Sequence, residues 1–342
     1  MLPTFALAAA LSMACPPDNG IEAICGPVAS EDLARIPGTR WLIASGLNIG
    51  APAHLYLIDS RSKRSRALFP STRQGLGMQR EFRDICPGPL QPGRMSLDGL
   101  GIRAAGQGRP PMLLAANHGD RHAIEFFRVE MRPEPVLTWA GCVPMPKGTL
   151  ANAVVPLADG GMLVSSFHDP DDRDAWNRMD RGEPTGGVWE WHADSGWKML
   201  PIGAIPGANG IETSTDERTL YISAWASQQL LVFDRVLGAT RAMPLDFRPD
   251  NIHRAPDDSL IVGGQRARVR DIAACGASCP QPWLVARIDP SSGAVTNLLA
   301  GPGSELTNYA CGGMEIDGTL FMTLRGAPRI AWKRIASSRR DP

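Results

Sequence analysis

Short apolar runs recur in pairs along the chain, and turn-forming residues separate the two runs of each pair. The pairs are Trp41–Ser45 with Leu55–Asp59, Met112–Ala116 with Ile124–Arg128, Met162–Ser166 with Val188–Trp191, Leu220–Ala224 with Leu230–Asp234, Leu260–Gly263 with Leu284–Asp289, and Leu320–Leu324 with Ile330–Arg334. Runs of this length, bounded by Gly, Pro, Asp and Ser, are typical of β-strands rather than helices. Many short strands without a long amphipathic run predict an all-β protein.

A second feature precedes each pair, namely a polar or small residue followed two positions later by an aliphatic one. The six segments are Glu31-Asp32-Leu33, Asp98-Gly99-Leu100, Asn152-Ala153-Val154, Asn209-Gly210-Ile211, Asp250-Asn251-Ile252 and Gly312-Gly313-Met314. Their starting residues are 67, 54, 57, 41 and 62 positions apart. A repeat of about 40–60 residues has the size of a four-stranded propeller blade. The sequence therefore predicts a six-bladed β-propeller over residues 30–335.

The innermost strands of a propeller line one axial tunnel, so equivalent residues of the blades form a ring around it. The predicted ring contains Glu31, Asp98, Asn152, Asn209, Asp250 with Asn251, and Gly312. Five of these six positions offer oxygen ligands, and none offers a thiol or an imidazole. Oxygen ligands with two or three negative charges suit calcium, although each residue alone could simply form a turn. The expected site is a metal site in the central tunnel.

Four segments at these positions resemble the paraoxonase/arylesterase family, within the wider group of calcium-dependent lactonase propellers that includes gluconolactonase. The segments are Ser30-Glu31-Asp32, Asn117-His118 before Ile124-Glu125-Phe126-Phe127, Asn209-Gly210-Ile211, and Asp250-Asn251-Ile252. Each segment is short, and their order and spacing from about Ser30 to Arg334 carry the resemblance.

The resemblance implies one catalytic calcium ion, held by Glu31, Asn152, Asn209, Asp250 and Asn251. A second, structural ion of the family would lie near Asp32. Its partner aspartate is replaced here by Ala153, which makes the second ion doubtful.

The resemblance also implies catalytic residues. His118 matches one histidine of the family's proposed dyad, Asp98 stands where the other would be, and His168 resembles a histidine of the pocket. The expected reaction is calcium-dependent hydrolysis of a lactone or carboxylic (aryl) ester, in which the metal polarises the carbonyl and an activated water attacks. A gluconolactonase-like sugar lactonase is one alternative. A non-catalytic propeller that binds a ligand or partner, with a structural calcium, is the other.

Composition narrows the choice of partner and mechanism. Lys+Arg and Asp+Glu both number 35 in the 342 residues, so the neutral chain gives no reason to expect a nucleic-acid partner. The small-molecule lactone or ester substrate is what the resemblance implies. No Gly-x-Ser-x-Gly elbow occurs, and no Gly-x-Gly-x-x-Gly or Walker pattern follows a strand. The loop from Asp169 to Gly187 is either a solvated loop or a cover over the site, with Trp176 and Met179 as an apolar wall in the second case. The sequence does not indicate an oligomeric state.

The N-terminus predicts export to the periplasm or the exterior. Residues 1–14 form a short apolar run that ends in Ser12-Met13-Ala14, which is typical of a signal peptide. Cleavage before Cys15 would allow a lipid anchor on that residue and leave an N-terminal segment at 15–29. The six other cysteines could form up to three disulfides, including a local bridge between Cys275 and Cys279. Residues 336–342 are expected to be a C-terminal tail.

Overall fold

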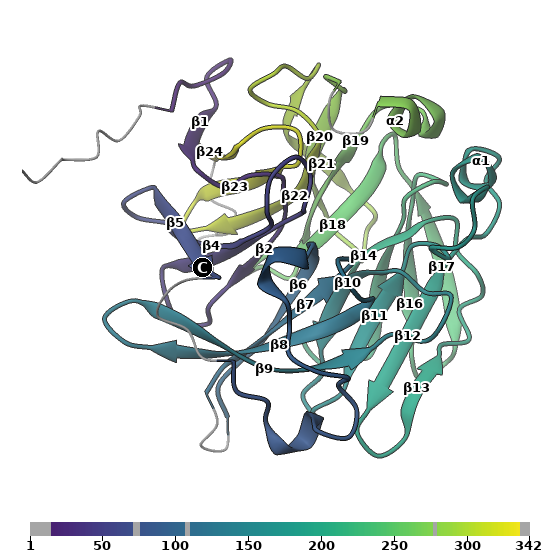
Figure 1. Ribbon diagram of the computed structural model, residues 1–342. Coiled ribbons are helices and arrows are strands. Elements are labelled where there is room, and N and C mark those ends of the chain that lie inside the picture. Colours follow the sequence, from purple (N-terminus) through teal and green to yellow (C-terminus); the bar gives the residue numbers. More distant parts are fainter. Residues whose placement is uncertain (1–14, 71–75, 107–109, 276–278, 336–342) are drawn as a thin grey trace, which may run out of the picture.

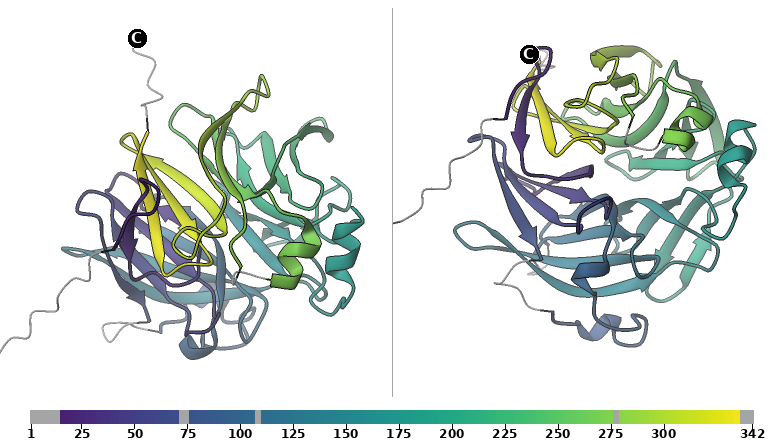
Figure 2. Two further views of the ribbon diagram at one scale, coloured as in Figure 1. Left: turned by 90° about the horizontal axis from the view of Figure 1, so that it is seen from above. Right: turned by 45° about the horizontal axis from the view of Figure 1, so that its top comes forward.

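The computed structural model describes residues 15–70, 76–106, 110–275 and 279–335. Six four-stranded antiparallel sheets surround one axis (Figures 1 and 2), which confirms the predicted six-bladed β-propeller. The predicted signal peptide (1–14) and C-terminal tail (336–342) lie outside the described residues.

Each blade is formed by strands that follow one another along the chain, except for the last blade. The first three blades contain β2 (Ser30–Arg35), β3 (Trp41–Gly46), β4 (Leu55–Asp59) and β5 (Arg64–Phe69); β6 (Leu97–Arg103), β7 (Met112–Asn117), β8 (Ala123–Met131) and β9 (Pro135–Pro144); and β10 (Ala151–Pro156), β11 (Met162–Ser166), β12 (Gly187–His192) and β13 (Gly196–Met199). The fourth and fifth contain β14 (Ala208–Thr213), β15 (Thr219–Ala224), β16 (Gln229–Asp234) and β17 (Ala239–Pro244); and β18 (Arg248–Arg254), β19 (Leu260–Gln265), β20 (Trp283–Ile288) and β21 (Val295–Gly301). The sixth combines β22 (Ala310–Ile316), β23 (Thr319–Leu324) and β24 (Arg329–Arg334) with β1 (Glu22–Cys25).

The first strands of the blades are the innermost ones. Strands β2, β6, β10, β14, β18 and β22 contact one another in this order, and β22 contacts β2 again. Apolar side chains fill the space between neighbouring sheets, as Leu33, Leu42, Phe321 and Ile330 do between the first and last blades. Burial of such side chains is the main favourable contribution to folding.

The N-terminal strand closes the ring of blades. β1 pairs antiparallel with β24, so that Glu22 lies opposite Trp332 and Cys25 opposite Arg329. In Figure 2 this strand (purple) lies beside the last blade (yellow). The sequence predicted a separate N-terminal segment over residues 15–29, but β1, which lies within it, belongs to the sixth blade. The pairing joins segments from the two ends of the chain in one sheet, in which β1 is the outermost strand.

The use of Cys15 in a disulfide differs from the expectation. Cys15 is bonded to Cys25, so the sulfur that a lipid anchor would need is already used in a disulfide. A second disulfide joins Cys86 to Cys142, and Cys279 is also disulfide-bonded. The side chain of Cys275, its predicted partner, lies outside the described residues. Disulfides persist in oxidising compartments, which favours an exported location.

A β-bulge occurs at the same place in all six blades. The register between the first and second strands shifts between Ser30 and Leu33, Leu97 and Leu100, Ala151 and Val154, Ala208 and Ile211, Pro249 and Ile252, and Ala310 and Gly313. Each bulge places one extra residue in the inner strand and re-aims the side chains beside it. The first residue of each bulge is Glu31, Asp98, Asn152, Asn209, Asp250 or Cys311.

This register corrects the sixth member of the predicted ring, which is Cys311 rather than Gly312. In the other blades an aliphatic residue lies two positions after the ring residue, but Gly313 occupies that position here. A Cβ on Gly313 would lie 2.8 Å from Cγ1 of Val285 and 3.1 Å from Cγ2 of Ile261. Neighbouring side chains thus fill the space that the aliphatic residue fills elsewhere. The ring therefore contains a thiol, contrary to the sequence-based expectation.

Two short helices lie side by side at one end of the tunnel (Figure 1). They are α1 (Ala175–Asp180), within the predicted covering loop, and α2 (Val269–Cys275). Met179 and Ile272 pack in one apolar cluster with Tyr309 and Cys311. The 3-10 helices η1 (Arg80–Phe82) and η2 (Pro92–Arg94) lie in the connection between β5 and β6. Among the described residues, no helix has the length and apolar character needed to cross a membrane.

Candidate metal centre and active site

A cavity of about 230 Å³ at this end of the tunnel gathers seven of the eight predicted site residues. They are Glu31, Asp98, His118, Asn152, His168, Asn209 and Asp250. The five ring members among them are 3–7% exposed and form its deepest part. Asn251, the eighth, lies one residue past the ring and lines a different cavity at the opposite mouth.

Four ring side chains have a buried oxygen without a hydrogen-bond partner. These atoms are Oδ1 of Asp98, Asn152, Asn209 and Asp250, and Oδ1 of Asn251 is a fifth such atom beside the ring. An unsatisfied buried polar group costs about 1–3 kcal/mol. Calcium takes six to eight oxygen ligands from carboxylates, amide carbonyls and water. The donor set therefore fits a hard divalent cation.

The ionised carboxylates of the ring are buried and repel one another when no cation lies among them. Burial raises the pKa of Glu31, and burial together with the charge of Glu31 raises the pKa of Asp98 and of Asp250 well above the usual range. The guanidinium of Arg325 lies 4.0 Å from Oε2 of Glu31 and offsets part of this repulsion. A divalent cation would favour the charged form of all three acids.

Hydrogen bonds behind the ring hold its ligands in place. Gln265 donates from Nε2 to Oδ2 of Asp250 at 2.9 Å, and its own Oε1 accepts from Nε1 of Trp225 at 2.8 Å. The backbone carbonyl of Glu31 accepts from Nδ2 of Asn251 at 3.0 Å and from Oγ1 of Thr323 at 2.8 Å. Such outer contacts fix the orientation of metal ligands.

The thiol of Cys311 completes the ring. Its Sγ donates to Oε2 of Glu31 at 3.3 Å, and ligand atoms of Glu31, Asp250 and Cys311 all lie within 4.8 Å of one another. Burial, with the nearby charge of Glu31, raises the pKa of Cys311 well above the usual value. The thiol is therefore protonated in the absence of a metal.

Two histidines line the cavity beside the ring. Nε2 of His118 donates to the carbonyl of Ala151 and lies 3.4 Å from Oδ2 of Asp98. Burial lowers the pKa of His118 to about 4, so its ring is neutral near pH 7 and keeps Nδ1 as the basic atom. Nδ1 of His168 donates to the carbonyl of Asp169 at 2.7 Å, which leaves Nε2 as the basic atom of that ring.

The side wall of the cavity is aromatic. Phe167, Trp176 and Trp225 pack edge to face with ring centroids 5.6–5.9 Å apart, and Tyr309 lies beside them. Trp176 comes from α1, so the loop from Asp169 to Gly187 contributes to the lining of the cavity, which favours the second of the two alternatives for this loop.

Sequence analysis did not identify most residues of this wall, although most of them occupy one equivalent position in the six blades. In each blade one residue of the second strand pairs with the residue just before the bulge. The residue after it is Leu47, His118, Phe167, Trp225, Gln265 or Arg325. Five of these six line the cavity, and Gln265 supports Asp250 instead. Only His118 was identified from the sequence.

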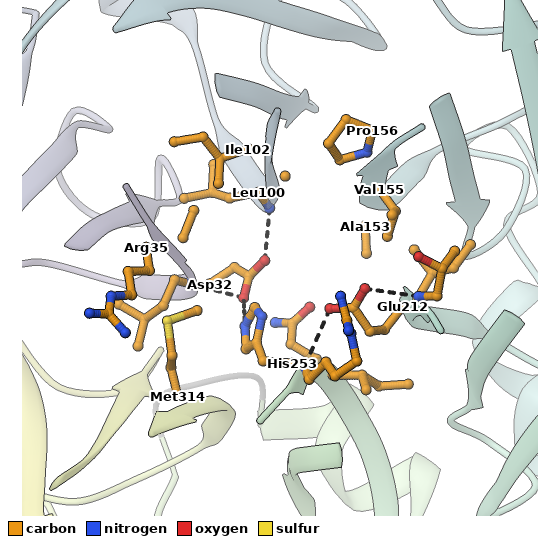
Figure 3. Close-up of a pocket in the computed structure, with 18 of the residues that line it drawn as sticks. Asp32, Arg35, Leu100, Ile102, Ala153, Val155, Pro156, Glu212, His253 and Met314 are labelled. Carbon is orange, nitrogen blue, oxygen red and sulfur yellow. Dashed lines mark hydrogen bonds and ion pairs between the residues drawn. The ribbon is translucent and has the colours of Figure 1, made fainter. Parts of the chain in front are cut away.

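The opposite mouth of the tunnel does not fit a second ion. Oδ1 of Asp32 accepts from the backbone N–H of Leu33 at 2.8 Å and lies 2.7 Å from Nε2 of His253, and Oδ2 accepts from the N–H of Leu100 at 2.8 Å (Figure 3). Ala153 offers no side-chain oxygen there. Although burial alone would lower the pKa of His253, the charge of Asp32 raises it. Asp32 is therefore already paired within the protein.

In the ion-free protein, Asp98→Asn should raise the free energy of unfolding near neutral pH by on the order of 1 kcal/mol. The raised pKa of Asp98 means that its contribution to stability is present below the usual carboxyl pKa and is lost as the pH rises through the folded value. The increase in the free energy of unfolding caused by Asp98→Asn should therefore be smaller at about pH 4.5 than near pH 7. Urea unfolding of wild type and variant in excess chelator at both pH values measures this difference. Asp84→Asn, at an exposed residue, is the control, and equal effects of the two variants would contradict the prediction.

Comparison with known proteins relates the fold to lactonases. No protein-family model and no curated protein matches the sequence. Among solved structures, a gluconolactonase from Xanthomonas campestris is 17% identical with a TM-score of 0.57, and the match covers 91% of this chain and 88% of that one. A luciferin-regenerating enzyme is 11% identical (TM-score 0.59, covering 92% and 93%), and a candidate gluconolactonase is 15% identical (TM-score 0.55, covering 92% of each). The chain thus shares the six-bladed propeller fold of gluconolactonase-like proteins.

Proposed function

We propose that the protein is a calcium-dependent hydrolase of lactones or carboxylic (aryl) esters, acting in an exported compartment. The observation that carries this proposal is the group of unpartnered oxygens of Asp98, Asn152, Asn209 and Asp250 at the bottom of an aromatic cavity. The gluconolactonase-like fold supports a lactonase-type reaction.

The ligands of the ion would be Glu31, Asn152, Asn209 and Asp250, and the unpartnered Oδ1 of Asn251 would be the fifth of the set. Bound calcium would polarise the carbonyl of the substrate and stabilise negative charge on its oxygen. The rigid blades and the hydrogen bonds from Gln265 and Thr323 keep the ligand positions fixed before the substrate enters.

His118 is the proposed base, because its neutral ring lines the cavity next to the ring of oxygens. As water oxygen attacks the carbonyl carbon, the water proton passes to His118, and the ring then returns it to the departing alkoxide when the C–O bond breaks. Asp98 and the carbonyl of Ala151 hold the ring through Nε2. His168 is the alternative base on the same cavity.

The wall of the cavity favours an apolar acyl group or an aryl group over a sugar. Phe167, Trp176 and Trp225 line the cavity, whereas Arg325 is the guanidinium among the residues that line it. A sugar lactone would need several hydrogen bonds to its hydroxyl groups. Hydrolysis assays should therefore compare phenyl acetate and simple γ- and δ-lactones with gluconolactone.

Hydrolysis of the preferred substrate should require calcium and an intact ring. Chelation should abolish turnover and added calcium should restore it, while Asn209→Ala should lower kcat/KM by at least about 100-fold because it removes a ligand. Asn297→Ala, on the exposed outer strand β21, is the matched control. Steady-state assays with and without chelator measure these effects. A folded, calcium-loaded protein that is inert on the whole panel would instead favour the non-catalytic binder.

Trp176→Ala should discriminate between substrates. Loss of one aromatic contact of about 0.5–1.5 kcal/mol predicts a roughly 2- to 13-fold lower kcat/KM for phenyl acetate, with little change for a small lactone that does not reach the wall. Trp176→Phe keeps a ring there and should retain most of the activity. Equal losses on both substrates would show that Trp176 only supports the fold through Phe167 and Trp225.

A further inference from the structure

The sixth ring position differs chemically from the other five. Five blades present a carboxylate or carboxamide at the first residue of the bulge, and the sixth presents the thiol of Cys311. Cys311 is fully buried and is the free cysteine among the described residues. Its Sγ lies 3.3 Å from Oε2 of Glu31 and 3.5 Å from the carbonyl oxygen of Tyr309, so the sulfur reaches the ring while Cys311 also packs in the apolar cluster.

The thiol shares the ring with atoms that lack partners. Oδ1 of Asp250 and Oδ1 of Asn209 are buried and unpartnered, in side chains 3% and 6% exposed. Carboxylate oxygens of Glu31 and Asp250 and the sulfur lie within 4.8 Å of one another. An ion that binds these carboxylates therefore lies within reach of the sulfur.

We propose that the ring also binds a thiophilic divalent ion, such as zinc or cadmium, with Cys311 as a ligand. Thiolate ligands select soft and borderline metals, whereas calcium gains little from sulfur. As the metal–sulfur bond forms, the S–H bond breaks, the sulfur keeps the electron pair that it donates to the metal, and the proton passes to solvent through the cavity. No oxidant or reductant is needed. The inference rests on the metal site of the proposed function and assigns it a second class of ion.

Cadmium binding to the full chain tests the proposal. Ion-free wild-type protein and Cys311→Ser are titrated with Cd²⁺ and, separately, with Ca²⁺, followed by calorimetry and by ultraviolet absorbance of the thiolate-to-cadmium charge transfer. Serine keeps a hydrogen-bond donor toward Glu31 and removes only the sulfur. Wild type should show the charge-transfer band, and Cys311→Ser should lose it. Loss of an outer-shell contact lowers metal affinity by about 10-fold or more, and loss of a direct ligand should cost at least as much. The Cd²⁺ affinity of Cys311→Ser should therefore fall by at least ~10-fold, with a much smaller change in its Ca²⁺ affinity.

Two results would overturn the inference. If wild type binds both ions, shows no charge-transfer band and matches Cys311→Ser in Cd²⁺ affinity, the thiol is not a ligand, and the proposed calcium site stands. If wild type binds neither ion, the metal site itself fails, and the proposed function fails with it. Retained Ca²⁺ binding by Cys311→Ser shows that the variant is folded around an intact ring.

Discussion

One extra residue in the inner strand of every blade is the constraint on which the candidate site depends. In a regular strand, successive side chains alternate between the two faces of the sheet, but the bulge re-aims the side chain beside it. Six bulges at the same register therefore bring residues from Glu31 to Cys311 to one level of the axis. The packing there is close, because a Cβ on Gly210 would lie 2.2 Å from the carbonyl oxygen of Asp250. The ring can hold its groups in place only while the inner strands keep this spacing.

Buried carboxylates have different surroundings at the two ends of the tunnel. At the mouth lined by Leu100 and Ile102, Asp32 is paired with His253, and its oxygens accept backbone hydrogen bonds (Figure 3). At the other end Glu31, Asp98 and Asp250 are buried together, and burial together with repulsion between the acids raises their pKa values. Burial of unbalanced charge is costly. The protein therefore pairs its charge internally at one end and leaves at the other a site that a cation would complete.

The sequence was sufficient to predict the blades and most of the ring. The turn-bounded strands repeat at blade length, and the aliphatic residue two positions after Glu31, Asp98, Asn152, Asn209 and Asp250 marks the bulge. The same marker fails at Cys311 because Gly313 makes room for Val285 and Ile261, which come from another blade. The pairing of β1 with β24 joins segments whose proximity depends on closure of the whole ring. The ion pair of Asp32 with His253 likewise spans two blades.

A crystal structure of the protein grown with calcium, with the ion identified by its anomalous scattering, tests the central claim most directly. The account predicts one ion on the tunnel axis, with oxygen atoms of Glu31, Asn152, Asn209 and Asp250 at the ~2.3–2.6 Å typical of calcium, and Asp32 still paired with His253. A ring that remains empty at saturating calcium, or an ion bound at Asp32 instead, would contradict it.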